Sequence, residues 1–328
     1  MKKTLKGVLC AVVVICLIFA LTGCAKIIYV VGGAITAIEE INDGSWKEEQ
    51  QETIDANKPS EVVIEPFVAG TYGGIDFATP DDVVNYYIEC YNNTKAQTAS
   101  YVDKDGNTKE YYALLGDEKL IVDKILVEGT ENKMLNNAVP GMVTAAFAYN
   151  SYGLPPCNNR NPLIDNTNQN ETDPGEYDLR VTHFKPEYSL ASNVTENADG
   201  TITIVIQPKD ASMSARGGDS QGSFFSVLND LGETVDNLFT DYDMLSWASG
   251  TTQENCVVDY RGGTGKVTID PETKTIISAD YHMSVFVEVK HANVAVIKDK
   301  SGSLFLSYDM HYPASDDYIL KYNGITRK

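Results

Sequence analysis

Histidine and cysteine are the residues in this sequence whose spacing could build a metal site or activate a nucleophile. The chain contains four histidines and six cysteines. No two histidines have the spacing of zinc ligands on one helix face, and no two cysteines form a Cys-x-x-Cys motif. No catalytic triad motif is recognisable, although carboxylates are numerous enough to form constellations in space. The sequence therefore predicts no catalytic residue, no metal site and no cofactor, and we expect a protein that is not an enzyme.

Three glycine-containing segments approach known ligand-binding motifs without matching them. Residues 260–266 (YRGGTGK) resemble a phosphate-binding loop, but Val267 follows where Ser or Thr is required, and a strand rather than a helix comes next. In the acidic turn at residues 103–106, glycine is fourth, whereas a calcium-binding EF-hand loop needs it sixth. Residues 214–223 lack a nucleophile elbow, and Asp219 or Ser220 is better placed to cap a helix. We interpret the three segments as turns.

The N-terminus carries the most specific signal in the chain. Three lysines among the first six residues precede an uncharged apolar run from Val8 to Leu21, which is typical of a secretory signal. The run ends in Leu21-Thr22-Gly23-Cys24, which resembles the bacterial lipobox. That resemblance implies that residues 1–23 are a lipoprotein signal peptide and that Cys24 becomes the mature N-terminus and carries lipid such as palmitate. It implies a protein that is extracytoplasmic and lipid-anchored to the cell membrane.

An uncleaved transmembrane anchor is the alternative interpretation of the N-terminus. The apolar run at residues 8–20 is short for a bilayer, which needs about 20 residues in a helix. Residues 27–38 (IIYVVGGAITAI) are apolar again, however. Under either interpretation, the remainder of the chain lies outside the cytoplasm.

Composition indicates an ordinary globular protein with an acidic surface. Of 328 residues, 43% are hydrophobic and 22% are charged, so disorder cannot describe the whole chain. The formal net charge is −20, and removal of residues 1–23, with three lysines and no acid, leaves about −23. Such a surface repels nucleic acid phosphates, so the sequence excludes nucleic acid as a partner.

Three cysteines remain after the signal peptide and the lipidated Cys24. Cys90 lies in a predicted helix beside apolar residues, which predicts a buried thiol. Cys157 and Cys256 lie in loop-like surroundings, and we name them as a candidate disulfide. Spacing alone does not define the distance between their Cα atoms.

The mature chain divides into a tether and two halves with a similar order of elements. Residues 24–66 are predicted to be the lipidated N-terminus and an acidic tether, residues 67–210 a first helix-plus-sheet half, and residues 211–328 a second. The first half begins with a helix that Thr79 caps and Pro80 opens. Its further elements are a hairpin (100–102 and 108–115), a strand (120–127), two short helices (131–138 and 140–149), a long loop (153–176) and extended segments (181–184, 188–194 and 201–208).

The second half is predicted to start with a helix over residues 222–239 and a shorter helical piece over 241–248. Strands are expected at 256–260, 266–270, 275–290, 292–299 and 303–312. Residues 275–290 alternate, with apolar side chains from Ala279 to Val289 on one face and polar ones, including His282, on the other. This alternation predicts an antiparallel sheet that is covered on one face, with His282 and His311 on the polar faces of neighbouring strands.

The predicted fold class is α+β, with curved antiparallel sheets covered by amphipathic helices, in two halves with or without a continuous core. The predicted order of a helix followed by an antiparallel meander, downstream of a lipobox, resembles that of the LolA/LppX-type envelope lipoproteins over about residues 80–320. Residues 266–270, the turn DPET and residues 275–283 form a predicted strand-turn-strand segment that is similar to those of such proteins. The resemblance is architectural and implies a half-barrel that holds acyl chains. The sequence is also similar to clostridial-type lipoproteins of unknown role.

Two hypotheses of function follow from this architecture. The first is a non-catalytic carrier of a lipid or another hydrophobic ligand at the cell envelope. Its candidate ligand-lining residues are Tyr87, Tyr91, Phe224, Leu228, Tyr281, Met283, Val285 and Val287, which would equally well make a filled core. The second hypothesis is a protein–protein interaction or structural module of the envelope, with a filled core and a contact surface at residues 153–176 or at the sheet edge.

Overall fold

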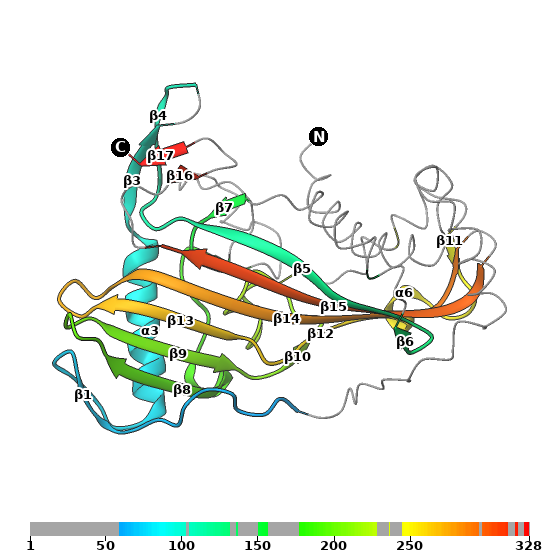
Figure 1. The fold of residues 1–328 in the computed structure, drawn as a ribbon, viewed down its shortest axis with the longest axis horizontal. Coiled ribbons are helices and arrows are strands. Elements are labelled where there is room, and N and C mark those ends of the chain that lie inside the picture. The colour runs from blue at the N-terminus through cyan, green and yellow to red at the C-terminus, as the bar shows by residue number, and fades with distance from the viewer. Residues whose placement is uncertain are drawn as a thin grey trace.

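The computed structural model describes residues 59–102, 105–131, 136, 150–156, 177–227, 236, 245–294, 297–313, 319–320 and 325–327. Over these residues the protein is mostly antiparallel sheet with few helices (Figure 1). The largest sheet has 11 strands, and two smaller sheets have two and four. The predicted antiparallel sheet is therefore confirmed. The predicted helical cover is represented in the described residues by one long helix.

The bounds of the elements are as follows. The helices are α3 (Pro80–Lys95), the 3-10 turn η4 (Pro186–Tyr188) and α6 (Thr252–Asn255). The strands are β1 (Gly70–Tyr72), β2 (Ile75–Phe77), β3 (Thr98–Val102), β4 (Thr108–Tyr112), β5 (Gly116–Val127), β6 (Thr130–Glu131), β7 (Asn150–Tyr152), β8 (Ser189–Glu196), β9 (Ile202–Pro208), β10 (Ala211–Ser212), β11 (Leu245–Trp247), β12 (Cys256–Tyr260), β13 (Thr264–Asp270), β14 (Thr275–Val294), β15 (Ile297–Tyr312), β16 (Ile319–Leu320) and β17 (Ile325–Arg327).

Strand β14 is the central element of the large sheet. One of its edges pairs with β15 from Ala279 to Val294. The opposite edge is shared in succession by β13, β12 and β11. Residues 261–263 form a glycine-rich turn that joins β12 to β13, so the turn predicted from the sequence is present. A side chain at Gly263 would stand 2.8 Å from the carbonyl oxygen of His282, so the turn can pass this close to β14 only with glycine.

The alternation predicted for residues 275–290 is confirmed. From Ala279 to Val289 every second side chain is at most 3% exposed, whereas Asp280, His282 and Lys290 are exposed on the other face. We call these the inner and the outer face of the sheet. The predicted strands at 292–299 and 303–312 differ from the structure, because β14 continues to Val294 and β15 is one unbroken strand.

Helix α3 starts where the sequence predicts. Thr79 is the N-cap, its Oγ1 accepts from the backbone N–H of Asp82, and a carboxylate oxygen of Asp82 accepts from the backbone N–H of Thr79 at 2.8 Å. Pro80 follows as the first helical residue. The buried side of the helix includes Val83 and Tyr87, in the predicted stripe.

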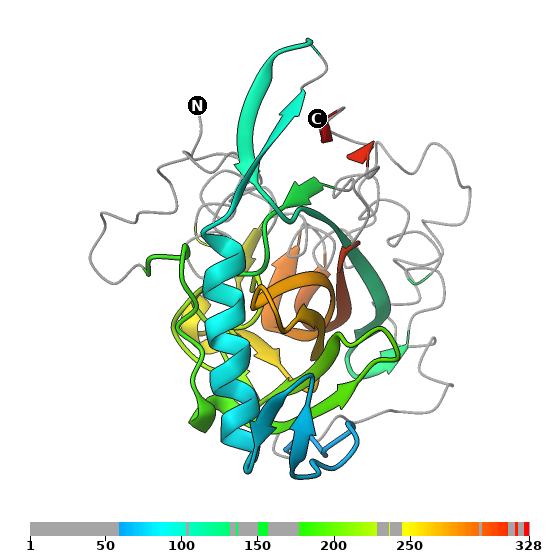
Figure 2. The ribbon, with the colours of Figure 1, turned by 90° about the vertical axis from the view of Figure 1, so that its left-hand side faces the viewer.

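Polar side chains join α3 to the inner face of the sheet near both of its ends. Ser192 on β8 donates to the carbonyl oxygen of Pro80 at 2.9 Å. Thr94 accepts from the backbone N–H of Ile276 on β14 at 2.7 Å, while Asn93 donates to the carbonyl oxygen of Lys274. The helix therefore crosses the sheet from β8 to the start of β14 (Figure 2).

The two predicted halves contribute to one sheet. Its order is β6-β5-β15-β14-β13-β9-β8, so strands from residues 67–210 flank strands from residues 211–328 on both sides. Most of the buried apolar residues likewise belong to one cluster, to which α3 and β13–β15 contribute. The C-terminal β17 pairs with β3 in the four-stranded sheet, whose β3–β4 hairpin was predicted.

Three further predicted elements differ from the structure. Residues 181–184 form no strand. Residues 222–227 form turns and coil rather than the start of a helix, because the loop closes on itself: the N–H of Gly217 donates to the carbonyl oxygen of Gly222 at 2.7 Å. Residues 245–247, predicted as helical, are strand β11 because they pair with β14. Most of the predicted helices at 131–138 and 140–149, and the greater part of the loop 153–176, lie outside the described residues.

The last residues of the predicted tether lie against the sheet. Residues 59–66, here called the N-terminal arm, run along the outer side of β8 and β9 toward β1 (Figure 1). The side chains of Asn193 and Gln207 bind its backbone. Phe67, where the folded part was predicted to start, packs against the apolar core.

Candidate functional site

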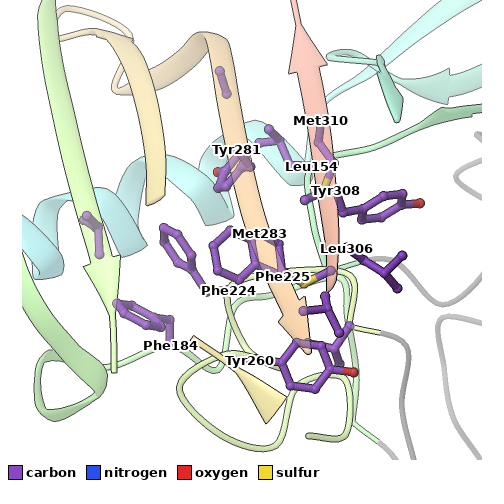
Figure 3. Close-up of a cluster of buried hydrophobic side chains, with 14 of the residues drawn as sticks. Leu154, Phe184, Phe224, Phe225, Tyr260, Tyr281, Met283, Leu306, Tyr308 and Met310 are labelled. Carbon is purple, nitrogen blue, oxygen red and sulfur yellow. The ribbon is translucent and has the colours of Figure 1, made fainter. Parts of the chain in front are cut away.

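The structure brings the predicted ligand-lining residues together on the inner face of the sheet. Tyr87 and Tyr91 come from α3, Phe224 from the turn segment, and Tyr281, Met283, Val285 and Val287 from β14. Figure 3 shows Phe224, Tyr281 and Met283 of this set. All seven are buried, with at most 3% of each residue exposed. Leu228 lies outside the described residues.

Phe224 is the central ring of this cluster. Its centroid lies 5.6 Å from the ring of Tyr87, 5.5 Å from that of Tyr281 and 4.9 Å from that of Phe184, which the sequence did not single out. Gly265 on β13 makes room for it, since a Cβ there would stand 2.6 Å from the ring. Aromatic pairs at such distances contribute about 0.5–1.5 kcal/mol each beyond the burial of their area. The rings therefore pack against one another between α3 and the sheet.

The polar atoms inside this cluster bond to one another. The hydroxyl groups of Tyr87 and Tyr281 lie 3.1 Å apart and share a hydrogen bond. Burial raises the pKa of Tyr87 and that of Tyr281 well above the usual tyrosine value. Both phenols therefore stay neutral at physiological pH, where they form a hydrogen bond but exchange no proton.

A buried lysine, which sequence reasoning missed, lies at the end of the same helix. Lys95 is 3% exposed, and its ammonium donates to the hydroxyl of Tyr91 at 2.9 Å and to the carbonyl oxygens of Leu154 and Pro156 at 2.6 and 2.7 Å. The ammonium also lies 5.3 Å from the ring centroid of Tyr91 and 5.6 Å from that of Tyr112. A lysine four residues after Tyr91 on the buried stripe was the available signal. The contacts fasten the segment 154–156 to α3.

Three histidine–aspartate pairs join β14 to β15: His291 with Asp299, whose Nδ1 and carboxylate oxygen lie 2.8 Å apart, and two more on the outer face. Nδ1 of His282 lies 2.7 Å from a carboxylate oxygen of Asp309, and Nδ1 of His311 lies 2.5 Å from one of Asp280. Each of these two pairs joins residues directly opposite in the β14–β15 register. The prediction that His282 and His311 lie on the polar faces of neighbouring strands is confirmed. The four side chains of the two pairs are about half exposed or more.

Ser284 extends one of these pairs into a Ser-His-Asp arrangement that the sequence did not reveal. Its Oγ lies 3.4 Å from Nε2 of His282, which is long for a nucleophile and its base. His282 and Ser284 are ladder residues of β14, paired with Asp309 and Ser307 on β15. Catalysis of acyl transfer also needs donors aimed at an oxyanion. The ladder directs backbone N–H groups along the sheet plane, whereas the three side chains stand above it. Asp309 and Ser284 therefore orient the imidazole of His282.

The structure describes two of the four cysteines that were given a role, Cys90 and Cys256. Cys90 is completely buried on α3, as predicted, and burial raises the pKa of its thiol to about 12. Cys256 is 1% exposed on β12. Cys157, its predicted disulfide partner, lies outside the described residues, so the pairing stays a prediction. The same holds for lipidation at Cys24.

The described part of the chain contains neither a metal-binding cluster nor a membrane-spanning helix. No group of three or more His, Cys, Asp or Glu residues is arranged there to hold a metal ion. Among the same residues, no helix is both long enough and apolar enough to cross a membrane. Comparison of the chain with protein-family models, curated proteins and solved structures finds no match.

Proposed function

We propose that this protein is an extracytoplasmic lipoprotein, anchored to the cell membrane through Cys24, whose folded domain acts without catalysis as an interaction or structural module of the envelope. The anchor rests on the lipobox-like Leu21-Thr22-Gly23-Cys24 and the apolar run before it. The domain's role rests on the inner face, where aromatic side chains contact one another and the hydroxyls of Tyr87 and Tyr281 are paired. A core filled in this way leaves the surface as the place of recognition.

The half-barrel shape is part of the same proposal. A 20-residue strand, β14, crossed on its inner face by helix α3 supports a curved sheet of the LolA/LppX kind. In this protein the helix and the turn segment at residues 222–227 would occupy the concavity that holds acyl chains in a carrier. Partners are then the membrane, through the lipid, and an envelope protein.

Metabolic labelling tests the anchor. The full chain produced in a bacterial host with a palmitate analogue should incorporate label and fractionate with membranes. Cys24→Ala should abolish incorporation, whereas Cys16→Ala, inside the signal peptide, should leave it unchanged. Label that persists in Cys24→Ala would contradict the proposed anchor.

Carriage of a hydrophobic ligand is the second candidate function. Met283 and Met310 lie in the buried aromatic cluster (Figure 3). Thioether side chains adapt to irregular spaces, so they favour an apolar guest more than rigid branched residues would. A lipid that co-purifies in a one-to-one ratio, in addition to the covalent anchor, would support this candidate over the interaction module.

A further inference from the structure

Three exposed valines lie on the segment that leads into the fold. Val62 and Val63, on the N-terminal arm, are 54% and 71% exposed, and Val68, just beyond the arm, is 66% exposed. The other exposed large hydrophobic residues in the part of the chain that the structure describes, Tyr177 and Val181, are less exposed, at 37% and 42%. Single exposed apolar side chains are common, whereas several on one segment indicate an interaction surface. We call Val62, Val63 and Val68 the valine strip.

Hydrogen bonds hold the backbone of the valine strip while its side chains face water. The amide of Gln207 on β9 donates to the carbonyl oxygen of Glu61 and accepts from the N–H of Val63, both at 2.9 Å. The hydroxyl of Tyr72 on β1 donates to the carbonyl oxygen of Val68 at 3.0 Å. A partner that binds the strip therefore meets a backbone that is already ordered, which lowers the entropy cost of binding.

The surroundings of the valine strip are acidic. Glu61 and Glu65 are exposed on the arm, and Glu196 is exposed at the end of β8, the strand beside which the arm runs. Neither residues 59–94 nor residues 189–208 contain a lysine or an arginine. The arm, the β1–β2 hairpin, β8 and β9 therefore present carboxylates without a basic side chain of their own.

We propose that the valine strip, with Glu61 and Glu65, binds a basic amphipathic segment of an envelope protein, in which Lys or Arg alternates with apolar residues. Interfaces combine an apolar centre with a polar rim, and opposite charges across the rim select the partner. The valines supply the apolar part of this surface, and the two glutamates supply charge of one sign. The same carboxylates repel anionic lipid headgroups, so the chemistry favours a protein over the membrane surface.

This inference rests on the proposed function, because it names the surface through which an interaction module would recognise its partner. It depends neither on the lipid at Cys24 nor on the filled core. Absence of lipidation would appear in the labelling experiment, and a carried lipid would appear as a co-purifying molecule. Failure of the valine strip would appear only in the peptide titration described next.

Titration of the full chain with a defined peptide tests the valine strip. The probe is a labelled peptide of Lys-Val repeats, and fluorescence anisotropy in a non-ionic detergent measures its affinity. Val62→Ser/Val63→Ser/Val68→Ser should weaken binding by about tenfold or more, although it leaves the net charge unchanged. The control Val181→Ser, at an exposed valine of another segment, should leave the affinity unchanged. A peptide of Lys-Ser repeats, which has the same charge, should bind the wild type as weakly as the triple variant binds the probe.

The charged rim is tested with the same probe. Glu61→Gln/Glu65→Gln should weaken binding about fivefold and reduce its dependence on salt. The matched control Asp105→Asn/Glu187→Gln removes two exposed acids elsewhere, so it should have a smaller effect. Equal affinities of the wild type and the valine variant would overturn the proposal. Equal effects of the two charge variants would overturn it as well, because the peptide would then be attracted to the acidic protein as a whole.

A membrane in place of a protein partner gives a different result. The chain Val63→Cys/Cys157→Ser, labelled at residue 63 with an environment-sensitive dye, is anchored in vesicles that contain phosphatidylglycerol. Without the peptide, the dye should keep the emission of a water-exposed label. A blue shift on reconstitution alone would assign the valine strip to the lipid surface and overturn the protein partner.

Discussion

The hydroxyl groups of Tyr87 and Tyr281 meet 3.1 Å apart in the completely buried space between α3 and β14. These residues are 194 positions apart in the chain, so the bond ties helix α3 to the central strand of the sheet. Most buried hydroxyl groups have a hydrogen-bond partner, and here each phenol is the partner of the other. The pair therefore stabilises the junction of the two predicted halves.

Removal of one of the two phenolic oxygens should destabilise the protein by more than the hydrogen bond itself contributes, because the other oxygen is left unpaired. Tyr281→Phe leaves the hydroxyl of Tyr87 buried and unpaired, which costs about 1–3 kcal/mol. The double variant Tyr87→Phe/Tyr281→Phe removes both polar atoms, so its loss of stability should be smaller than the sum of the two single losses. Urea unfolding of the four proteins measures this coupling. Strictly additive losses would show that the hydroxyls do not interact.

Alkaline pH should destabilise the protein in part through Cys90. Burial raises the pKa of this thiol from 9.0 to about 12 in the folded state. The unfolded chain therefore loses the proton first, and the stability that the neutral thiol contributes is lost as pH rises from about 9 toward 12. Unfolding free energies measured from pH 8 to pH 11 should fall less steeply for Cys90→Ala than for the wild type. Parallel pH profiles of the two proteins would contradict a contribution of the Cys90 thiol to the loss of stability at alkaline pH.

Lys95 should matter far more than a surface lysine. Lys95→Met preserves most of the side chain's volume but removes the ammonium that donates to the carbonyl oxygens of Leu154 and Pro156, at a cost of about 1–3 kcal/mol. The matched control is Lys274→Met, which removes an exposed pair with Glu89. Exposed ion pairs contribute little, so thermal unfolding should barely change in the control. Equal shifts in melting temperature would contradict the buried role of Lys95.

The Ser-His-Asp arrangement on the outer face should be chemically silent. A fluorophosphonate probe, which labels activated serines, should leave Ser284 unmodified, because its Oγ lies 3.4 Å from the imidazole of His282 on an open ladder. Mass spectrometry of the treated full chain detects any adduct. Labelling that disappears in both Ser284→Ala and His282→Ala would contradict a non-catalytic protein.

The sequence was sufficient for those features that depend on neighbouring residues. The alternation from Ala279 to Val289 gives the buried face of β14, since successive strand side chains point to opposite sides. Thr79, Pro80 and Asp82 give the start of α3 through capping chemistry. Both are local rules, and both predictions are confirmed.

Features that depend on distant pairing could not be predicted. Whether β5 lies beside β15 is decided by two segments some 180 residues apart, and no local pattern encodes that choice. Phe224 was placed on a helix because its apolar neighbours recur at helical spacing, yet the residues from 222 to 227 are all buried in a closed loop. A segment buried on all sides carries no informative periodicity. The contacts of Asn193 and Gln207 with residues 59–66 were missed for a related reason, because these polar side chains lie on a strand face expected to contact solvent.

Native mass spectrometry of the full chain, extracted from bacterial membranes in mild detergent, tests the central claim most directly. The account predicts one mass, that of a chain beginning at Cys24 with covalently bound acyl lipid and no further non-covalent molecule. A chain that retains residues 1–23 would contradict the lipid anchor. A non-covalent lipid bound to every chain would contradict the filled core and establish a carrier instead.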